Sequence, residues 1–291
     1  MANPIFNNVA TYVNENTEPI YGKIVLDIPH LNRFSLQGNA KGGEVALNIL
    51  TANPVLGDGT SCNVESGETT FSQRKMKIAN YATNTEYCEY AMLPYWAGLK
   101  VKLGSSDEVA LAEAFTNAEV TKINKMLERN IWQGKLTADK MDGILTIAEA
   151  EGVSATVTAS DVYGKINELR LEAQGAGVDN VVVAVGADKY YQFVDALVAR
   201  NLYHFKSEAT DEMVTFFPGT NVEVWGIAGL NGTDKAIAFN PYNIHYGFDE
   251  EAGVSNVKWV IDEVNDKAHL KTRFNAGIQI AFPNEVFYTA L

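Results

Sequence analysis

The C-terminal part of the chain contains a long, regular alternation of polar and apolar residues. Between Lys267 and Phe282 the even-numbered positions are small or apolar, while the odd-numbered positions up to Gln279 are mostly charged or polar. A period of two residues places these sets on opposite faces of a β-strand. At about 3.3 Å per residue the strand would extend over roughly 50 Å, unless a bulge at Gly277 divides it.

This predicted strand is as long as the molecule is wide. A compact chain of this length has a diameter of roughly 50 Å. Val257–Val264 forms a second predicted strand, joined to the first by Asn265 and Asp266, a two-residue hairpin signal. The pair of strands favours a flat, elongated subunit over a round one.

Residues 105–134 predict a long helix. Ser105 and Glu108 fit a capping box, and Gly134 fits a left-handed stop. The apolar positions recur on one face at Val109, Ala112, Val120, Ile123, Leu127 and Ile131. About 26 residues at 1.5 Å each give a helix of roughly 39 Å, more than twice the mean length.

Residues 51–86 predict an extended hairpin. Turn signals between Asn53 and Gly67 precede a strand-like run, Thr69–Ile78, that carries three cations. The run has too little apolar surface for a core strand. The local sequence leaves two interpretations open: the hairpin projects and lies on a neighbouring molecule, or it is a solvated surface hairpin.

Residues 1–50 mix Asn, Gly and Pro with short apolar runs. Ile20–Ile28 is interpreted as a strand. The rest predicts an arm that another surface must order, with a loosely packed tail of a globular domain as the alternative. Further along, an aromatic cluster indicates packed irregular structure at Tyr87, Tyr90, Tyr95 and Trp96.

Residues 141–240 predict a separate α/β unit. Helices are expected from Ser160 to Gly175 and from Asp188 to Val198. The expected strands are Asp142–Ile147, Val181–Val185, Asn221–Trp225 and Lys235–Phe239.

Composition narrows the classes of function. The chain has 291 residues, 46% hydrophobic and 20% charged, and a net charge of −13, which disfavours a dedicated nucleic-acid binder but permits a container around nucleic acid. There is no apolar run long enough to span a membrane and no secretory signal at the N-terminus, so the protein is expected in the cytoplasm. Cys62 and Cys88 form no CxxC pair and are expected to be reduced thiols.

The sequence shows no signature of a catalytic, cofactor or metal site. The four histidines are isolated, no GxSxG elbow is present, and Gly175-Ala-Gly177 precedes its strand instead of following it as a dinucleotide-binding loop does. The acidic groups at 249–251 and 262–263 fit loops and strand ends of an acidic chain. A site assembled from scattered residues would leave no such signature.

The order of these elements resembles the major capsid protein of tailed phages, of the HK-ninety-seven type. The segments that carry the resemblance are Thr70–Ile78, Ile131–Gly134, Met141–Leu145, Val181–Tyr190 and Arg273–Pro283. The resemblance implies an α+β fold with an N-terminal arm and lead-in, an extended hairpin loop, a peripheral domain with a spine helix, an α/β axial domain, and closing strands of the peripheral domain. The corresponding ranges are 1–50, 51–86, 87–140, 141–240 and 241–291.

The resemblance also implies a function without catalysis or cofactors. Subunits of this family form pentamers and hexamers that tile an icosahedral shell around double-stranded DNA, so the expected location is the virion, after assembly in the host cytoplasm. Because no long segment precedes the arm, either a separate scaffolding protein is expected or none is needed, with a portal and possible decoration proteins as further partners. The resemblance places subunit contacts at Phe71, Arg74, Lys75, Lys77, Glu68 and Tyr12.

Two alternatives remain open. An encapsulin-like compartment of a cell would share the fold and bind cargo peptides instead of DNA. A small-molecule α/β enzyme that uses residues 141–240 would be a dispersed protein of low oligomeric order with a ligand pocket.

Overall fold

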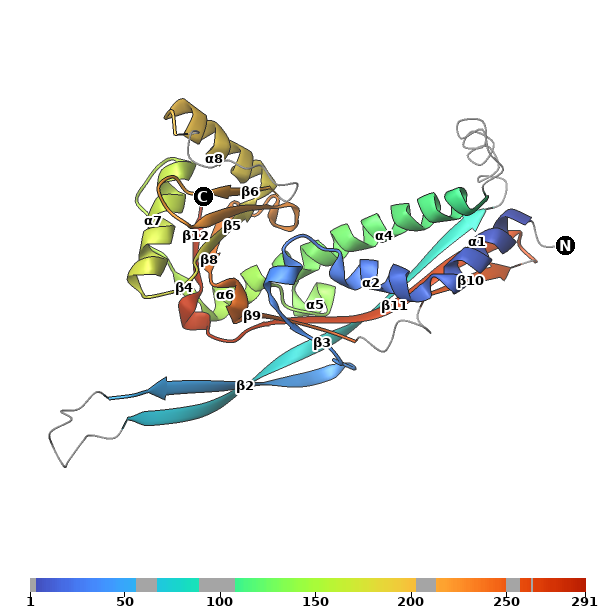
Figure 1. Ribbon diagram of the computed structural model, residues 1–291, viewed down its shortest axis with the longest axis horizontal. Coiled ribbons are helices and arrows are strands. Elements are labelled where there is room, and N and C mark those ends of the chain that lie inside the picture. The colour runs from blue at the N-terminus through green and yellow to red at the C-terminus, as the bar shows by residue number, and fades with distance from the viewer. Residues whose placement is uncertain (1–3, 56–66, 89–107, 203–212, 250–256, 263) are drawn as a thin grey trace.

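The computed structural model describes the chain except for residues 1–3, 56–66, 89–107, 203–212, 250–256 and 263. Helices and strands both contribute to one elongated subunit, which confirms the α+β class. Figure 1 shows a body that contains two sheets and a long helix, with a two-stranded hairpin projecting from it.

The first sheet is built around β11 (Lys267–Ile280), the strand predicted from the alternating pattern. It pairs antiparallel with β10 (Val257–Asp262) and with β3 (Glu68–Cys88), so the predicted closing pair of strands is confirmed. The even-numbered side chains of β11 are buried in the core. The remaining strands of this sheet are β9 (Ile244–Phe248), β1 (Ser35–Gln37) and β2 (Gly43–Asn53).

No bulge divides β11 at Gly277, so of the two possibilities left by the sequence the unbroken strand is the one observed. The glycine serves a close approach instead. A Cβ atom at this position would lie 2.4 Å from the carbonyl oxygen of Lys77. The pairing of β3 with β11 ends one step earlier, at Ala79 and Ala276, where β3 leaves the sheet towards the hairpin.

The long helix is α4 (Glu108–Gln133), which confirms the helical prediction. Four of its predicted apolar positions, Val120, Ile123, Leu127 and Ile131, are buried, whereas Ser105 lies outside the described residues. Gly134 follows the end of the helix, and glycine is required there for a different reason from the one expected. Its φ is not positive, but a Cβ atom there would lie 2.8 Å from the carbonyl oxygen of Met141.

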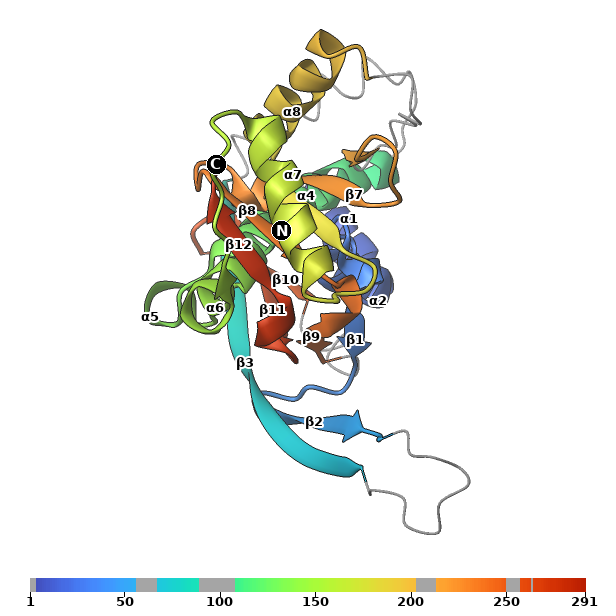
Figure 2. The same cartoon turned by 90° about the vertical axis from the view of Figure 1, so that its left-hand side faces the viewer.

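The second sheet belongs to the α/β unit, and most of its predicted elements are confirmed. Its six strands, in spatial order, are β4 (Val153–Ser154), β12 (Phe287–Ala290), β8 (Lys235–Phe239), β5 (Val182–Gly186), β7 (Glu223–Ile227) and β6 (Val214–Phe216). Two helices, α7 (Val162–Gly175) and α8 (Ala187–Ala199), pack on this sheet through buried residues such as Ile166 and Phe193. Figure 2 shows α7 in front of the sheet and the hairpin extending below the body.

The helix caps of this unit differ from the predicted ones. Asp161, not Ser160, caps α7 by accepting a hydrogen bond from the Gly164 backbone N–H. Helix α8 begins at Ala187, whose N–H donates to the Asn231 side chain at 2.7 Å, so the cap comes from a distant turn. Asp188 lies in the first turn, where a negative charge is favourable.

The N-terminal segment is helical, so the predicted strand at Ile20–Ile28 was wrong. Helices α1 (Pro4–Glu15) and α2 (Thr17–Leu26) precede a short 3-10 turn, η1 (Leu31–Arg33). The buried residues of α2 are Ile20, Tyr21, Ile24 and Val25. Their spacing of one and four residues places them on one helical face. Val9 and Val13 of α1 are also buried, so residues of the expected arm are ordered on their own chain.

The predicted strand at Asp142–Ile147 was also wrong. The segment follows the short helix α5 (Leu136–Asp139), and from Ile144 onward it is the start of helix α6 (Ile144–Glu151). The buried residues of α6 are Ile144, Leu145, Ile147 and Ala148. That is helical spacing, but it spans too few residues to be distinguished from a buried strand.

The long helix is joined to the α/β unit by polar contacts with η2 (Ala228–Leu230). Glu128 is buried, and its Oε1 accepts a hydrogen bond from the Gly229 N–H at 3.0 Å. Gln133 Nε2 donates to the Gly229 carbonyl oxygen at 2.5 Å. Burial raises the pKa of the Glu128 carboxyl, and its backbone hydrogen bonds partly offset this effect. The joint therefore holds a carboxyl group that retains its proton to higher pH than usual.

Candidate assembly interface

The hairpin is formed by β2 and the first half of β3, which pair from Gly43 and Ile78 to Asn53 and Glu68. Every residue from Leu50 to Asn53 and from Glu68 to Gln73 is exposed. A two-stranded ribbon is at best marginally stable in water without a packed face. The outer half of the hairpin therefore lacks the covering surface that the rest of the fold has.

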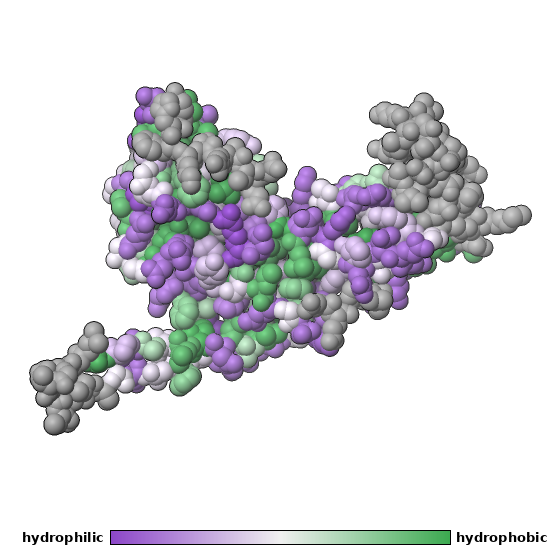
Figure 3. All heavy atoms as spheres, in the orientation of Figure 1, coloured by the Kyte–Doolittle hydropathy of each residue, from purple (hydrophilic) through white to green (hydrophobic). Residues whose placement is uncertain are grey.

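The base of the hairpin is anchored in the body. Leu47, Met76 and Ile78 are buried in a small cluster together with Ala40. The Lys75 carbonyl oxygen accepts a hydrogen bond from Gln279 Nε2 at 2.9 Å, which ties β3 to β11. Hydrophobic residues gather where the hairpin leaves the body, as the space-filling view shows (Figure 3). The hairpin is thus held at one end and bare at the other.

The three hairpin cations have different surroundings. Arg74 forms an ion pair with Glu151 of α6, and Lys75 forms one with Glu44 of β2 at 2.8 Å. The hydrogen bond and charge of the Glu44 carboxylate raise the pKa of the Lys75 ammonium group, and the same contact lowers the pKa of Glu44. Lys77 is exposed and lies opposite Glu44 in the pairing register. Two of the three cations therefore stabilise the hairpin within its own chain.

The exposed apolar residues of the hairpin form a cross-strand pair. Phe71 is 84% exposed, and Leu50, which lies opposite it in register, is 57% exposed. Sequence reasoning named Phe71 but missed Leu50, because the hairpin was expected to begin at residue 51. The sequence contained the necessary pattern. Val45, Leu47 and Ile49 recur at every second position, which predicts a strand with these residues on one face and Leu50 on the other.

The structure does not bring all six predicted contact residues together. Five lie on β3, with Glu68 at its outer end opposite Asn53. Tyr12 lies on α1 and packs against the main core of its own chain. Partial burial, with a contribution from the Glu113 carboxylate, raises the pKa of its hydroxyl.

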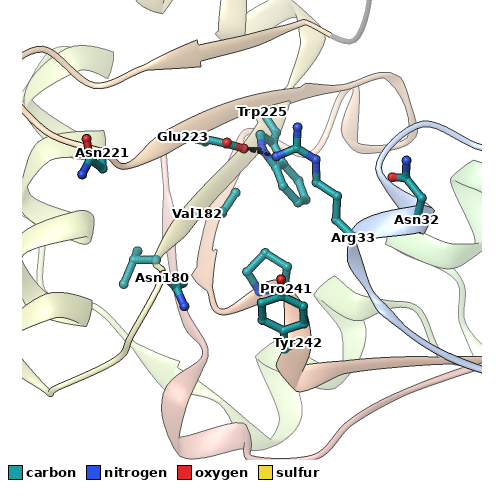
Figure 4. A pocket seen from close by; sticks show the side chains of 10 residues that line it. Asn32, Arg33, Asn180, Val182, Asn221, Glu223, Trp225, Pro241 and Tyr242 are labelled. Atoms are coloured by element: carbon teal, nitrogen blue, oxygen red, sulfur yellow. Dashed lines mark hydrogen bonds and ion pairs between the residues drawn. The ribbon is translucent and has the colours of Figure 1, made fainter.

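A pocket of about 440 Å³ lies between η1, the starts of β5 and β7, and the 3-10 turn η3 (Pro241–Asn243). Figure 4 shows Arg33 and Glu223 pointing toward each other on one wall, near Trp225. Glu223 also accepts a hydrogen bond from Trp225 Nε1 at 2.7 Å. The carboxylate that could act as a base is thus already bound to a cation and an indole N–H, which suits a structural role.

Other candidate chemistry is sparse in the described ranges. Among these residues, no group of three or more His, Cys, Asp or Glu could hold a metal ion. Cys88 is an exposed free thiol, and Cys62 lies outside the described residues. No helix in the described part of the chain is long and apolar enough to cross a lipid bilayer.

Comparison with known proteins identifies the fold. No protein-family model matches the chain, and no curated protein matches its sequence. A structure of Microbacterium phage Oxtober96 matches with a TM-score of 0.57 at 13% identity, over 90% of this chain and 90% of that chain. The satellite phage P4 procapsid, in a structure that includes its size determination (Sid) protein, gives a TM-score of 0.56 at 12% identity over 94% and 89%. The capsid of Myoviridae phage XM1 gives 0.51 at 12% over 89% and 89%.

These similarities extend over 90% and 94% of the chain for the Oxtober96 and P4 structures. At 12–13% identity they establish the fold and not the individual residue roles. The chain has the major capsid protein fold of tailed phages, as the resemblance in its sequence predicted.

Proposed function

We propose that this protein is the subunit of a phage capsid, in which pentamers and hexamers form an icosahedral shell around double-stranded DNA. The observation that carries the proposal is the bare outer half of the hairpin, on a subunit with the phage capsid fold. An exposed ribbon with an apolar pair at its centre acquires a packed face when it lies on another molecule.

A second copy of the chain is the simplest such molecule. If each subunit places its hairpin on the next, every subunit both gives and receives one contact, and a rotation that closes makes a ring. The projection of the hairpin beyond the body supports this head-to-tail arrangement (Figure 1). In this arrangement Phe71 and Leu50 supply apolar contact area, while Glu68 and Lys77 supply charges at the rim.

Arg74 and Lys75 contribute in a different way from the one expected. Their ion pairs with Glu151 and Glu44 hold the hairpin at a fixed angle to its own body. We infer that they orient the contact more than they form it. Tyr12 is partly buried in its own core, so it would take part only through the portion that remains exposed.

The domain roles follow the same proposal. Residues 141–240 would be the axial domain, directed at five-fold and six-fold centres. Residues 87–140 and most of 241–291 would form the peripheral domain, with α4 as its spine helix, whereas β12 near the end of the chain pairs with β8 in the sheet of the α/β unit. A separate scaffolding protein, a portal and decoration proteins are the proposed partners during assembly, which would take place in the host cytoplasm before the subunits become part of the virion.

Negative-stain electron microscopy of the purified protein, together with its mass in solution, tests the proposal. Shells, or rings of five and six subunits, are expected, and DNA in particles from the native source distinguishes a phage capsid from a compartment that binds cargo peptides. A protein that stays monomeric or dimeric even with its scaffolding protein present would overturn the proposal and direct attention to the pocket at Arg33.

A further inference from the structure

The pocket between η1, η3 and the starts of β5 and β7 has no role in the proposed function (Figure 4). Its volume of about 440 Å³ lies within the range of roughly 300–1,000 Å³ that small-molecule sites occupy. The buried part of its lining consists of Val181, Val182, Trp225 and Pro241. A ligand would therefore meet mainly the more exposed side chains of the walls.

Side-chain amides make up half of that exposed lining. Asn32, Asn180 and Asn221 are all exposed, and their amides make no hydrogen bond to any other residue that the structure describes. Each amide offers two N–H donors and one carbonyl acceptor. Three such groups around one pocket suit a ligand that both donates and accepts hydrogen bonds.

An ion pair adds a further donor and a further acceptor, both held in place. Arg33 Nη1 donates to Glu223 Oε2, which also accepts the indole N–H of Trp225 at 2.7 Å. The Arg33 guanidinium carbon lies 5.4 Å from the centre of the Trp225 ring. Arg33 Nη2 and Glu223 Oε1 have no partner within the described ranges, and the two side chains are 37% and 20% exposed. The pair can therefore donate to and accept from the same ligand.

The pocket lining is electrically neutral. Arg33 and Glu223 are the only charged side chains among its ten residues, and they neutralise each other. A phosphate or carboxylate ligand would compete with Glu223 for the guanidinium group, and a cationic ligand would compete with Arg33 for the carboxylate. The unpaired groups of the pocket therefore favour a neutral, polar ligand.

One aromatic ring of the lining is open to a ligand. Tyr242 is 68% exposed. Its backbone is fixed on both sides, because its N–H donates to Asn240 Oδ1 at 3.1 Å and its carbonyl oxygen accepts from Ser35 Oγ at 2.8 Å. The face of an aromatic ring is electrically negative. The C–H groups of a sugar ring carry partial positive charge, so they stack favourably on such a face.

We propose that this pocket binds a neutral saccharide. One sugar ring stacks on Tyr242, and its hydroxyl groups, which both donate and accept, bond to the three amides and to the Arg33–Glu223 pair. A peptide is the less suitable ligand. Peptide sites use a sheet edge or an apolar groove, whereas the apolar side chains of this lining other than Tyr242 are buried.

Saturation-transfer NMR on the full-length protein tests the proposal. The probes are the methyl glycosides of glucose, galactose, mannose, rhamnose and N-acetylglucosamine, each added alone. At least one of them is expected to receive saturation from the protein, with a dissociation constant on the order of 1 mM for a small ligand at an open site. No transfer to any of these sugars would overturn the proposal.

Variants of Tyr242 test the stacking contact. Tyr242→Ala should weaken sugar binding at least about tenfold, whereas Tyr242→Phe keeps the ring face and should bind within about twofold of the wild type. Tyr191→Ala is the matched control, because Tyr191 is 56% exposed on α8 and does not line the pocket. It should leave binding unchanged. Equal losses in the two alanine variants would overturn the proposal.

An amide variant tests the polar contacts independently. Asn221→Ala should weaken binding about 2-fold to 10-fold, the effect of losing one or two hydrogen bonds. Asn221 is preferred to Asn180, because Asn180 has a φ of 49°, where alanine is strained. Thermal melts check that each variant is folded. Unchanged binding in both Asn221→Ala and Tyr242→Ala would place the sugar elsewhere and overturn the proposal.

Competition experiments identify other classes of ligand. N-acetyl-tetraalanine amide and inorganic phosphate are expected to leave the sugar signals unchanged. Displacement of the sugar by the peptide at equal concentration would identify a peptide site, and displacement by phosphate would identify an anion site. Either result would overturn the proposal.

The length of the saccharide separates two sources of the ligand. A trisaccharide of the sugar that binds, if bound at least about tenfold more tightly than its methyl glycoside, would identify a polysaccharide as the source. Equal affinities would identify a free monosaccharide. The proposal does not depend on the capsid role: shells formed by a protein without sugar binding would refute it alone, and sugar binding by a protein that never forms shells would support it.

Discussion

Replacing Phe71 with alanine tests whether the outer half of the hairpin is an assembly surface. In the isolated subunit the Phe71 side chain is 84% exposed, and its cross-strand neighbour Leu50 is also exposed. Truncating a side chain that is already in water removes little from the folded subunit, so the expected change in its free energy of unfolding is within about 0.5 kcal/mol.

The effect on assembly is expected to be much larger. Full burial of a phenylalanine side chain against a neighbour is worth about 1.5–3 kcal/mol. Losing it weakens each subunit contact roughly 10-fold to 150-fold, because about 1.4 kcal/mol corresponds to a factor of ten. The same contact recurs around a closed ring, so the lowest protein concentration that supports assembly should rise by at least about tenfold.

The assay compares two alanine variants of the same strand. Light scattering during a dilution series gives the critical concentration for assembly, and a thermal melt of free subunits gives their stability. Met76→Ala is the matched comparison, because Met76 is fully buried at the hairpin base. It is expected to cost the subunit about 2–5 kcal/mol, or to unfold the hairpin locally.

The reasoning is refuted by either of two results. The first is assembly of Phe71→Ala at the same concentration as the wild type, which would mean that the exposed apolar pair does not lie in a contact. The second is a melting temperature lowered as much as by Met76→Ala, which would mean that Phe71 supports its own chain.

Three other perturbations test separate parts of the fold. Lys77→Glu should impair assembly more than it changes the melting temperature, and normal particles would remove this residue from the contact. Gly277→Ala should destabilise the subunit by about 1–3 kcal/mol, because its Cβ would meet a backbone oxygen at 2.4 Å. Gly22→Ala, at a helical position with open space around it, should stabilise the subunit by up to about 1 kcal/mol. Equal melting temperatures of the two variants would contradict this contrast. Burial raises the pKa of Glu128, so the folded state holds a proton that the unfolded chain releases, and stability falls as the pH rises from about 4.3 towards the raised value. Glu128→Gln should flatten this part of the dependence of melting temperature on pH relative to the wild type. Parallel profiles for the two proteins would contradict a role of Glu128 in the pH dependence.

The long elements were predictable because their periodicity extends over many residues. The alternation along β11 continues long enough to exclude a helix, and the apolar face of α4 recurs often enough to exclude a strand. The α2 and α6 segments failed for the opposite reason. Their buried residues occupy little more than one or two helical turns, and β-branched residues such as Ile20, Ile24 and Ile144 fit a strand equally well.

Features that depend on distant parts of the chain were not predictable. The N-terminus of α8 is capped by Asn231, 44 residues away. Gly134 and Gly277 are needed because other backbone segments pass close to them, not because of their own dihedral angles. No local pattern contains that information.

The candidate contact surface was partly predictable. A polar strand run left a projecting hairpin as one of two interpretations, and the resemblance to phage capsid proteins named Phe71 within it. The ion-pair partners of Arg74 and Lys75 came only with the structure, because Glu151 lies 77 residues from Arg74 in sequence. This proximity changes the expected role of these cations from contact to orientation.

The most direct test of the central claim is a cryo-electron microscopy reconstruction of assembled particles in which side chains are visible. The account predicts closed shells in which each hairpin lies on the adjacent subunit, with Phe71 and Leu50 covered by that neighbour. A closed shell in which the outer half of the hairpin remains in solvent, touching no other copy, would contradict it.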